Sequence, residues 1–187
     1  NEGRAILSGL VNEAEKLGEW VLADRALNNL VQDAPPEGLT EHTQMLERMR
    51  IDAERAGFEA LSVAAYYQGS ARLAMNTGDL DGAIAALEKG RVRDRGYQRQ
   101  GRKADYHAVF LAGLYLEAGE LDLVDDILDH LRALPPLTNV SHPCLEFHLA
   151  CRREDLDAAD RALDEVLAIL EQETWRSGSF AHDLISA

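Results

Sequence analysis

Both cysteines of the chain and two of its six histidines lie in one short segment, SHPCLEFHLACRRED at 141–155. If this segment is helical, Cys144, His148 and Cys151 fall at positions i, i+4 and i+7 and share one face. Thiolate and imidazole groups on one face are ligand types that bind zinc, and His142 would be a fourth ligand. Three further interpretations are a reactive thiol pair, ordinary helix packing and the wall of a binding groove.

Motifs that carry enzyme chemistry are missing from the sequence. It contains no GxxxxGK[ST] phosphate loop, no GxGxxG turn, no GxSxG elbow and no HExxH metal motif. It also lacks a CxxC pair, and two cysteines seven residues apart on a helix would be about 10 Å apart, too far for a disulfide. We therefore predict a cytoplasmic protein that is not an enzyme and needs neither cofactor nor metal. Helix packing or groove lining is the interpretation we prefer for the cysteine segment.

The composition is typical of a single ordered domain. The chain has 187 residues, of which 46% are hydrophobic and 28% charged, so it can bury a sizeable core. Its formal net charge of -14 disfavours binding to nucleic acid or to anionic membranes. No apolar run approaches the length of about 20 residues that spans a bilayer, and no signal peptide is recognisable. Because the first residue is not Met, we expect a fragment of a longer protein.

Helical periodicity runs through the whole chain. Apolar residues recur at spacings of three and four, while alternating strand patterns are absent. Glycines and prolines interrupt the pattern at Gly18, 35–38, Gly57, Gly78, Gly119 and 135–136, where a left-handed residue or a proline ends a helix. About nine helices are predicted, at 5–18, 23–34, 43–57, 60–78, 81–90, 106–119, 121–131, 144–151 and 156–172. The longer connections expected are 91–103 and 135–143.

Three of the predicted helical hairpins align with one another. Their turns superpose Gly78, Gly119 and Glu154, which recur 41 and 35 residues apart. The second helices align at a small position and at a leucine position, namely Ala83, Val124 and Ala159, then Leu87, Leu128 and Leu163. These segments resemble the tetratricopeptide repeat, a unit of about 34 residues in which a tight turn joins two antiparallel helices.

The resemblance implies an all-α fold, a right-handed α-solenoid of about nine antiparallel helices. One domain over 1–187 is expected, with its best repeats at 58–100, 103–136 and 142–173. Such degenerate repeats are most similar to the C-terminal arrays of large bacterial signalling ATPases and LuxR-type regulators. The implied function is a protein- or peptide-interaction module, the sensor or scaffold region of a bacterial transcriptional or signalling regulator. The alternatives are a stand-alone receptor for a peptide signal and a small metal- or nucleic-acid-binding protein.

In tetratricopeptide arrays the first helix of each repeat lines a concave groove, and the resemblance assigns groove positions to this chain. They are Ala65, Gln68, Arg72, Met75 and Asn76 before one turn, Tyr106, Val109, Gly113, Leu116 and Glu117 before the next, and Cys144, His148, Cys151 and Arg152 before the third. The resemblance assigns Leu145, Leu149, Ala159 and Leu163 to the core of the repeat. The expected ligand is a protein segment, a peptide or another domain of the same chain, and an acidic ligand would contact Arg72.

A basic segment and an apolar segment outside the predicted groove are further candidates for contact with partners. Segment 91–103 carries a local net charge of +5 with Tyr97 among its bases, a pattern that nucleic-acid-binding proteins use. Because the rest of the chain is acidic, we prefer to interpret it as a helix end and loop whose bases face the negative end of the helix dipole. Apolar residues from Trp175 to Ile185 predict self-association through the C-terminal end, or contact with a neighbouring repeat.

Overall fold

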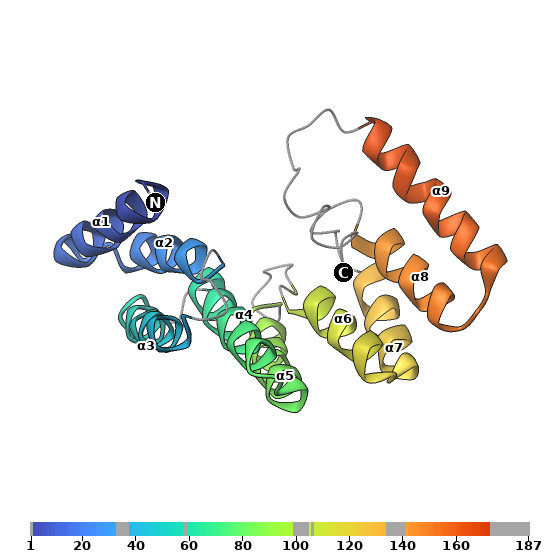
Figure 1. Ribbon diagram of the computed structural model, residues 1–187, viewed down its shortest axis with the longest axis horizontal. Helices are drawn as coiled ribbons and strands as arrows, with labels where there is room; N and C mark the ends of the chain where they lie inside the picture. The colour runs from blue at the N-terminus through green and yellow to red at the C-terminus, as the bar shows by residue number, and fades with distance from the viewer. Residues whose placement is uncertain are drawn as a thin grey trace. The chain divides into compact units, whose positions relative to one another are not determined.

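The computed structural model describes residues 2–32, 38–57, 60–98, 105, 107–133 and 141–172. In these ranges all regular secondary structure is helical, with nine α-helices and no strand, as the sequence predicted. The helices are α1 (Glu2–Leu17), α2 (Trp20–Gln32), α3 (Leu39–Arg55), α4 (Ala60–Asn76), α5 (Leu80–Gln98), α6 (Ala108–Ala118), α7 (Leu121–Arg132), α8 (Ser141–Arg152) and α9 (Leu156–Gln172) (Figure 1). Among these described helices, none has the length and apolar character needed to cross a membrane.

The helices group into two compact units, residues 1–101 with α1–α5 and residues 102–187 with α6–α9. The sequence predicted one domain over 1–187, and one continuous array across both units stays a prediction. The division follows α5, which continues to Gln98 although a connection was expected from residue 91. Arginine is a good helix former and Asp94 is buried, so the helix extends through most of the basic segment.

Unit 1 is organised around α2, which packs against α1, α3 and α4, while α4 packs in addition against α3 and α5. α3 and α4 approach closely at Gly69, where a Cβ would lie 2.6 Å from Leu46 Cδ2. A larger residue at this position therefore requires Leu46 to move. Four helices contribute the main apolar cluster, which consists of Val11, Ala14, Ala23, Ala26, Leu27, Leu30, Val31, Met45, Leu46, Met49 and Ala65.

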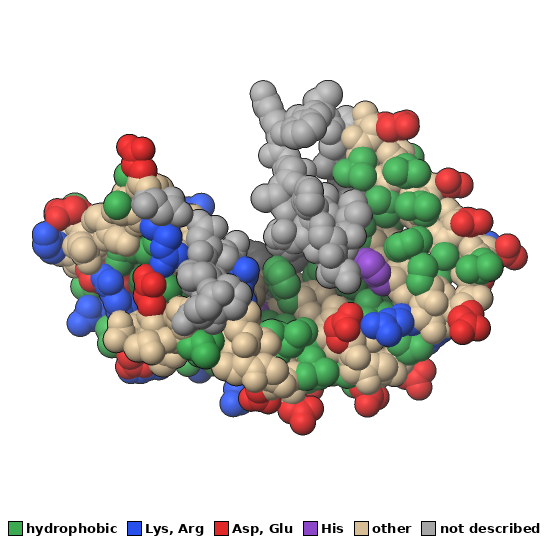
Figure 2. All heavy atoms as spheres, in the orientation of Figure 1, with side chains coloured by type: hydrophobic (Ala, Val, Ile, Leu, Met, Phe, Trp, Pro, Cys, Tyr) green, Lys and Arg blue, Asp and Glu red, His purple; other side chains and the backbone are tan. Residues whose placement is uncertain are grey.

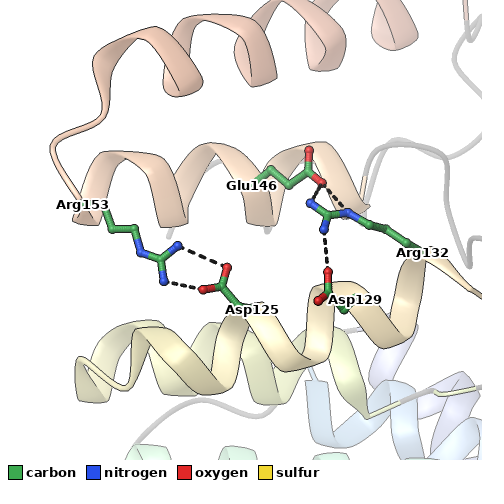
Figure 3. Close-up of polar contacts among 5 residues, drawn as sticks. All are labelled: Asp125, Asp129, Arg132, Glu146 and Arg153. Carbon is green, nitrogen blue, oxygen red and sulfur yellow. Dashed lines mark hydrogen bonds and ion pairs between the residues drawn. The ribbon is translucent and has the colours of Figure 1, made fainter.

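Unit 2 consists of the hairpins α6–α7 and α8–α9, and α8 packs against both helices of the first hairpin. On the face of this unit shown in Figure 2, most charged side chains are acidic. Arginines join α7 and α8 at the middle of α8 and directly after its C-terminal end (Figure 3). Arg132 Nη2 of α7 lies 2.6 Å from Glu146 Oε1 of α8, and Arg153, directly after α8, forms two hydrogen bonds with the Asp125 carboxylate of α7. Such bonds fix orientation, because a planar guanidinium accepts few alternative geometries.

The same turn closes the first helix of several hairpins. Gly18, Gly78 and Gly119 have φ values of 76°, 76° and 80°, and Glu154 has a φ of 59°. In each turn the next amide donates a hydrogen bond to the carbonyl five residues earlier, for example Glu120 N to Tyr115 O at 2.9 Å. This is the Schellman closure, in which a left-handed residue satisfies the last carbonyls of a helix. Glu154 thus shares the left-handed conformation of Gly78 and Gly119, the two glycines with which the sequence aligned it.

Replacing Glu154 with glycine is expected to raise the free energy of unfolding by about 0.5–1 kcal/mol. A left-handed residue with a Cβ costs about 1–2 kcal/mol, and the greater entropy of glycine in the unfolded chain offsets part of the gain. The reverse change, Gly119→Ala, should lower stability by about 1 kcal/mol. Urea titrations followed by circular dichroism measure both changes. Unchanged or reduced stability in Glu154→Gly would contradict the left-handed conformation.

Candidate interaction surface

The predicted groove residues of unit 1 lie along α4, and their exposure increases towards its C-terminal end. Ala65 is buried and Gln68 is half-buried, whereas Arg72, Met75 and Asn76 are exposed. The helix ends at Asn76. Only the last part of the predicted α4 surface is therefore accessible, and we call Arg72, Met75 and Asn76 the α4 end face.

Two predicted groove residues of unit 2 are buried near the starts of their helices. Val109 of α6 is 2% exposed and Cys144 of α8 is 3% exposed. Cys144 contacts Val166 of α9, and Ile169 packs against the same pair. A ligand approaching from solvent does not reach these two side chains, because the helix packing of the unit encloses them. Tyr106, also predicted for the groove, lies outside the described residues.

The C-terminal ends of α6 and α8 expose part of the predicted groove, although Leu116 of α6, also predicted to line it, is buried. Glu117, Cys151 and Arg152 are exposed there, while His148 is half-buried. Arg152 Nη2 lies 3.4 Å from Glu117 Oε1, and the two residues are 35 positions apart. Because both side chains are exposed, this ion pair contributes at most about 1 kcal/mol, and a ligand can replace it. We call Glu117, Cys151 and Arg152 the α6–α8 end face.

The cysteines and histidines of α8 do not form a shared reactive site. Both thiols are free, with Cys144 buried and Cys151 exposed. Burial raises the pKa of the Cys144 thiol, which therefore stays protonated at neutral pH and is a poor nucleophile and metal ligand. His142 lies in the first turn of α8, where burial lowers its pKa although Glu146 opposes the shift. Within the part of the chain that the structure describes, no group of three or more His, Cys, Asp and Glu side chains could hold a metal ion.

A buried histidine that sequence reasoning missed lies next to the Gly69 backbone of α4. His42 of α3 is almost fully buried, and burial lowers its pKa. The Gly69 backbone favours the protonated ring and opposes this shift, whereas the positive charge of Arg72 adds to it. The imidazole is therefore neutral at pH 7 and adds no positive charge to that of Arg72.

A buried carboxylate, also missed from the sequence, lies between α1 and α3. Asp52 shares the face of Met45 and Met49 at positions i, i+4 and i+7, the one signal that indicated burial. Burial and the negative charge of Glu15 raise the pKa of Asp52 to about 6. Arg48 lies 2.9 Å from Glu15 in the same cluster. The other buried polar residues among those described are Asp24, His42, Asp94, Asp105 and His107.

Comparisons of the chain with protein-family models, with curated proteins and with solved structures found no match in any of the three. The function must therefore be inferred from the residues of the chain itself and from the accessible end faces that its helices form.

Proposed function

We propose that the chain is a non-catalytic module that binds a protein segment or peptide, built from degenerate tetratricopeptide-like hairpins in a right-handed solenoid. In its parent protein it serves as the sensor or scaffold region of a bacterial transcriptional or signalling regulator. The observation that carries this proposal is the ion pair between Arg152 and Glu117, which joins predicted groove positions of two successive first helices.

A groove requires that successive first helices lie side by side. α6 and α8 pack against each other, and in unit 1 the alternate helices α2 and α4 do the same. Arg152 and Glu117 are separated by 35 positions, the same spacing as between the turn residues Gly119 and Glu154. Residues one repeat apart therefore meet at the surface, which is the arrangement that helical-repeat solenoids use to build extended binding faces.

The two end faces offer a mixture of contacts suited to a peptide. The α4 end face combines a guanidinium, a thioether and an amide, and the α6–α8 end face combines a carboxylate, a thiol and a guanidinium. Peptide grooves use such mixtures, with hydrogen bonds fixing the backbone and apolar contacts selecting side chains. Arg72 and Arg152 favour a ligand with acidic residues, because guanidinium groups bind carboxylates with two hydrogen bonds.

Charge reversal on the end faces tests this proposal. Baits carrying Arg72→Glu or Arg152→Glu are expected to capture a partner from source cells about tenfold less efficiently than wild type, because an arginine contact becomes a repulsion. Quantitative mass spectrometry of the captured material measures the difference. The matched control is Arg95→Glu, the same change at an exposed position of α5. Equal recovery by wild type and both end-face variants would contradict the proposed surface.

A further inference from the structure

The last described helix, α9, exposes an apolar position that is buried on its counterparts. The aligned leucines Leu87 of α5 and Leu128 of α7 are 2% and 1% exposed, whereas Leu163 of α9 is 38% exposed. The prediction that Leu163 belongs to the repeat core is therefore wrong. The difference from Leu128 has a physical reason, because α7 packs against α6 and also against the following helix α8, while α9 packs against α8 and no described helix follows it.

Leu163 belongs to an apolar stripe on α9. Its four leucines are between 37% and 73% exposed, and they are Leu156, Leu163, Leu167 and Leu170. At about 100° per residue these side chains fall within an arc of about 60°, and they extend over about 21 Å of the helix axis. Figure 2 shows hydrophobic side chains gathered over α9. We call these four residues the α9 stripe.

One edge of the α9 stripe is acidic. Asp157, Asp160, Asp164 and Glu171 are exposed, and helical geometry places all of them on the side of the stripe away from the buried residues of α9. Figure 2 shows acidic side chains along the outer margin of this helix. A partner that covers the stripe must therefore bring positive charge to this edge.

The contact of α8 with α7 shows how this chain covers a similar face. Arg153 forms an ion pair with Asp125, and its Nη2 lies 3.8 Å from Asp122 Oδ1. Both acids lie on α7, the helix that also carries the buried Leu128. A shift of 35 positions, the spacing of the two hairpin turns, takes Asp122, Asp125 and Leu128 to Asp157, Asp160 and Leu163. α9 thus repeats the two acids that bind Arg153 and the leucine that is buried on α7.

We propose that the α9 stripe docks an amphipathic helix of a partner protein, with apolar residues over the leucines and arginines or lysines along the acidic edge. A second copy of this chain fits less well, because two α9 helices would bring their acidic edges together. Residues 173–187 of the chain contain one arginine and two acids, so they do not supply the complementary charge. This surface lies on a different helix from the end faces, so either proposal can fail without the other.

Two helix-stabilised synthetic peptides test the proposed chemistry. Both carry the same leucine stripe, and one has arginines along its edge where its twin has glutamates. Fluorescence anisotropy with the intact chain is expected to show the arginine peptide binding at least about tenfold more tightly than its twin, with an affinity that falls as salt rises. Equal affinities, or no binding of the arginine peptide, would overturn the proposal.

Variants of the intact chain locate the site. Leu163→Gln and Asp160→Asn are expected to weaken binding of the arginine peptide by about tenfold and about threefold. Leu123→Gln and Asp126→Asn make the same changes at exposed positions of α7 and should leave the affinity within about twofold. Circular dichroism verifies that each variant is folded. Equal losses in the α7 controls, or no loss in Leu163→Gln, would contradict the assigned site.

Two measurements test whether a second copy of the chain, or the chain's own residues 173–187, covers the α9 stripe in place of a partner helix. A dimer in sedimentation velocity that Leu163→Gln dissociates would identify a second copy as the occupant and overturn the proposal. Tighter peptide binding in the double variant Phe180→Asp, Leu184→Asp would identify the chain's own residues 173–187 as the occupant, with the same consequence. A monomer whose peptide affinity this double variant does not change supports a partner helix.

Discussion

Asp52→Asn is expected to raise the free energy of unfolding of unit 1 by about 1–3 kcal/mol at pH 7.5 and to have little effect near pH 4. Asp52 is 1% exposed, and burial with the nearby Glu15 charge raises its pKa from 3.8 to about 6. The folded chain therefore binds this proton more tightly than the unfolded chain does. Stability is lost as the pH rises from about 3.8 to about 6, and the full cost of about 3 kcal/mol, at about 1.4 kcal/mol per pKa unit, applies above this window.

The basic residues around Asp52 compensate only part of this cost. Arg48 and Arg55 lower the pKa of Asp52, but less than burial and Glu15 raise it. Arg48 Nε also donates a hydrogen bond to Glu15 Oε1 at 3.1 Å. The Arg55 guanidinium lies 4.6 Å from the centre of the Trp20 ring. Both cations thus have other partners in the same cluster. Removing the Asp52 charge therefore relieves a burial cost without depriving either arginine of those other contacts.

Urea titrations between pH 4 and pH 7.5 measure the effect, and amide hydrogen exchange in α1–α5 assigns it to unit 1. The control is Glu54→Gln, which removes one negative charge from an exposed position of the same helix and should change stability by no more than about 0.5 kcal/mol. A gain in Asp52→Asn that is the same at every pH would show that the buried charge is not its cause.

The helices and turns of this chain could be predicted from the sequence because their determinants are local. Apolar spacing predicted the order and approximate positions of the helices, although α5 ends at Gln98 and not at the predicted residue 90. The alignment of turns placed Glu154 with Gly78 and Gly119, whose left-handed conformation it shares. α8 begins at Ser141, earlier than the predicted residue 144, because proline is tolerated in the first turn and Pro143 therefore does not delay the helix.

The coverage of each helix face could not be predicted in the same way. Periodicity shows that Cys144 and Cys151 share a face, but the first is buried against α9 and the second is exposed. Leu163 and Leu128 occupy the same position in their hairpins, and only Leu128 lies on a helix that the following described helix covers. Burial depends on which neighbouring helix lies over a residue, and spacing within one helix contains no information on that neighbour.

Asp105→Ala is expected to lower the free energy of unfolding of unit 2 by about 2–4 kcal/mol, against about 1 kcal/mol for Asp155→Ala. Both carboxylates accept a hydrogen bond from the amide three residues later, Asp105 Oδ1 from Ala108 N and Asp155 Oδ1 from Ala158 N, each at 3.0 Å. Asp155 is exposed and loses only its cap. The Asp105 side chain is fully buried, and its Oδ2 lies 2.9 Å from His130 Nε2 of α7. Its removal therefore leaves a cavity and deprives His130 of its partner.

A double-mutant cycle with His130→Ala separates the contact from the cap. The coupling energy between Asp105→Ala and His130→Ala should be at least about 1 kcal/mol, while Asp155→Ala and His130→Ala should add within about 0.5 kcal/mol. Urea titrations give the four stabilities, and hydrogen exchange in α6 and α7 shows whether both helices lose protection together. Equal losses in Asp105→Ala and Asp155→Ala would mean that capping accounts for the whole effect. A measured coupling instead means that the Asp105–His130 contact holds the start of α6 against α7, and with it the hairpin on which α8 and the α6–α8 end face are built.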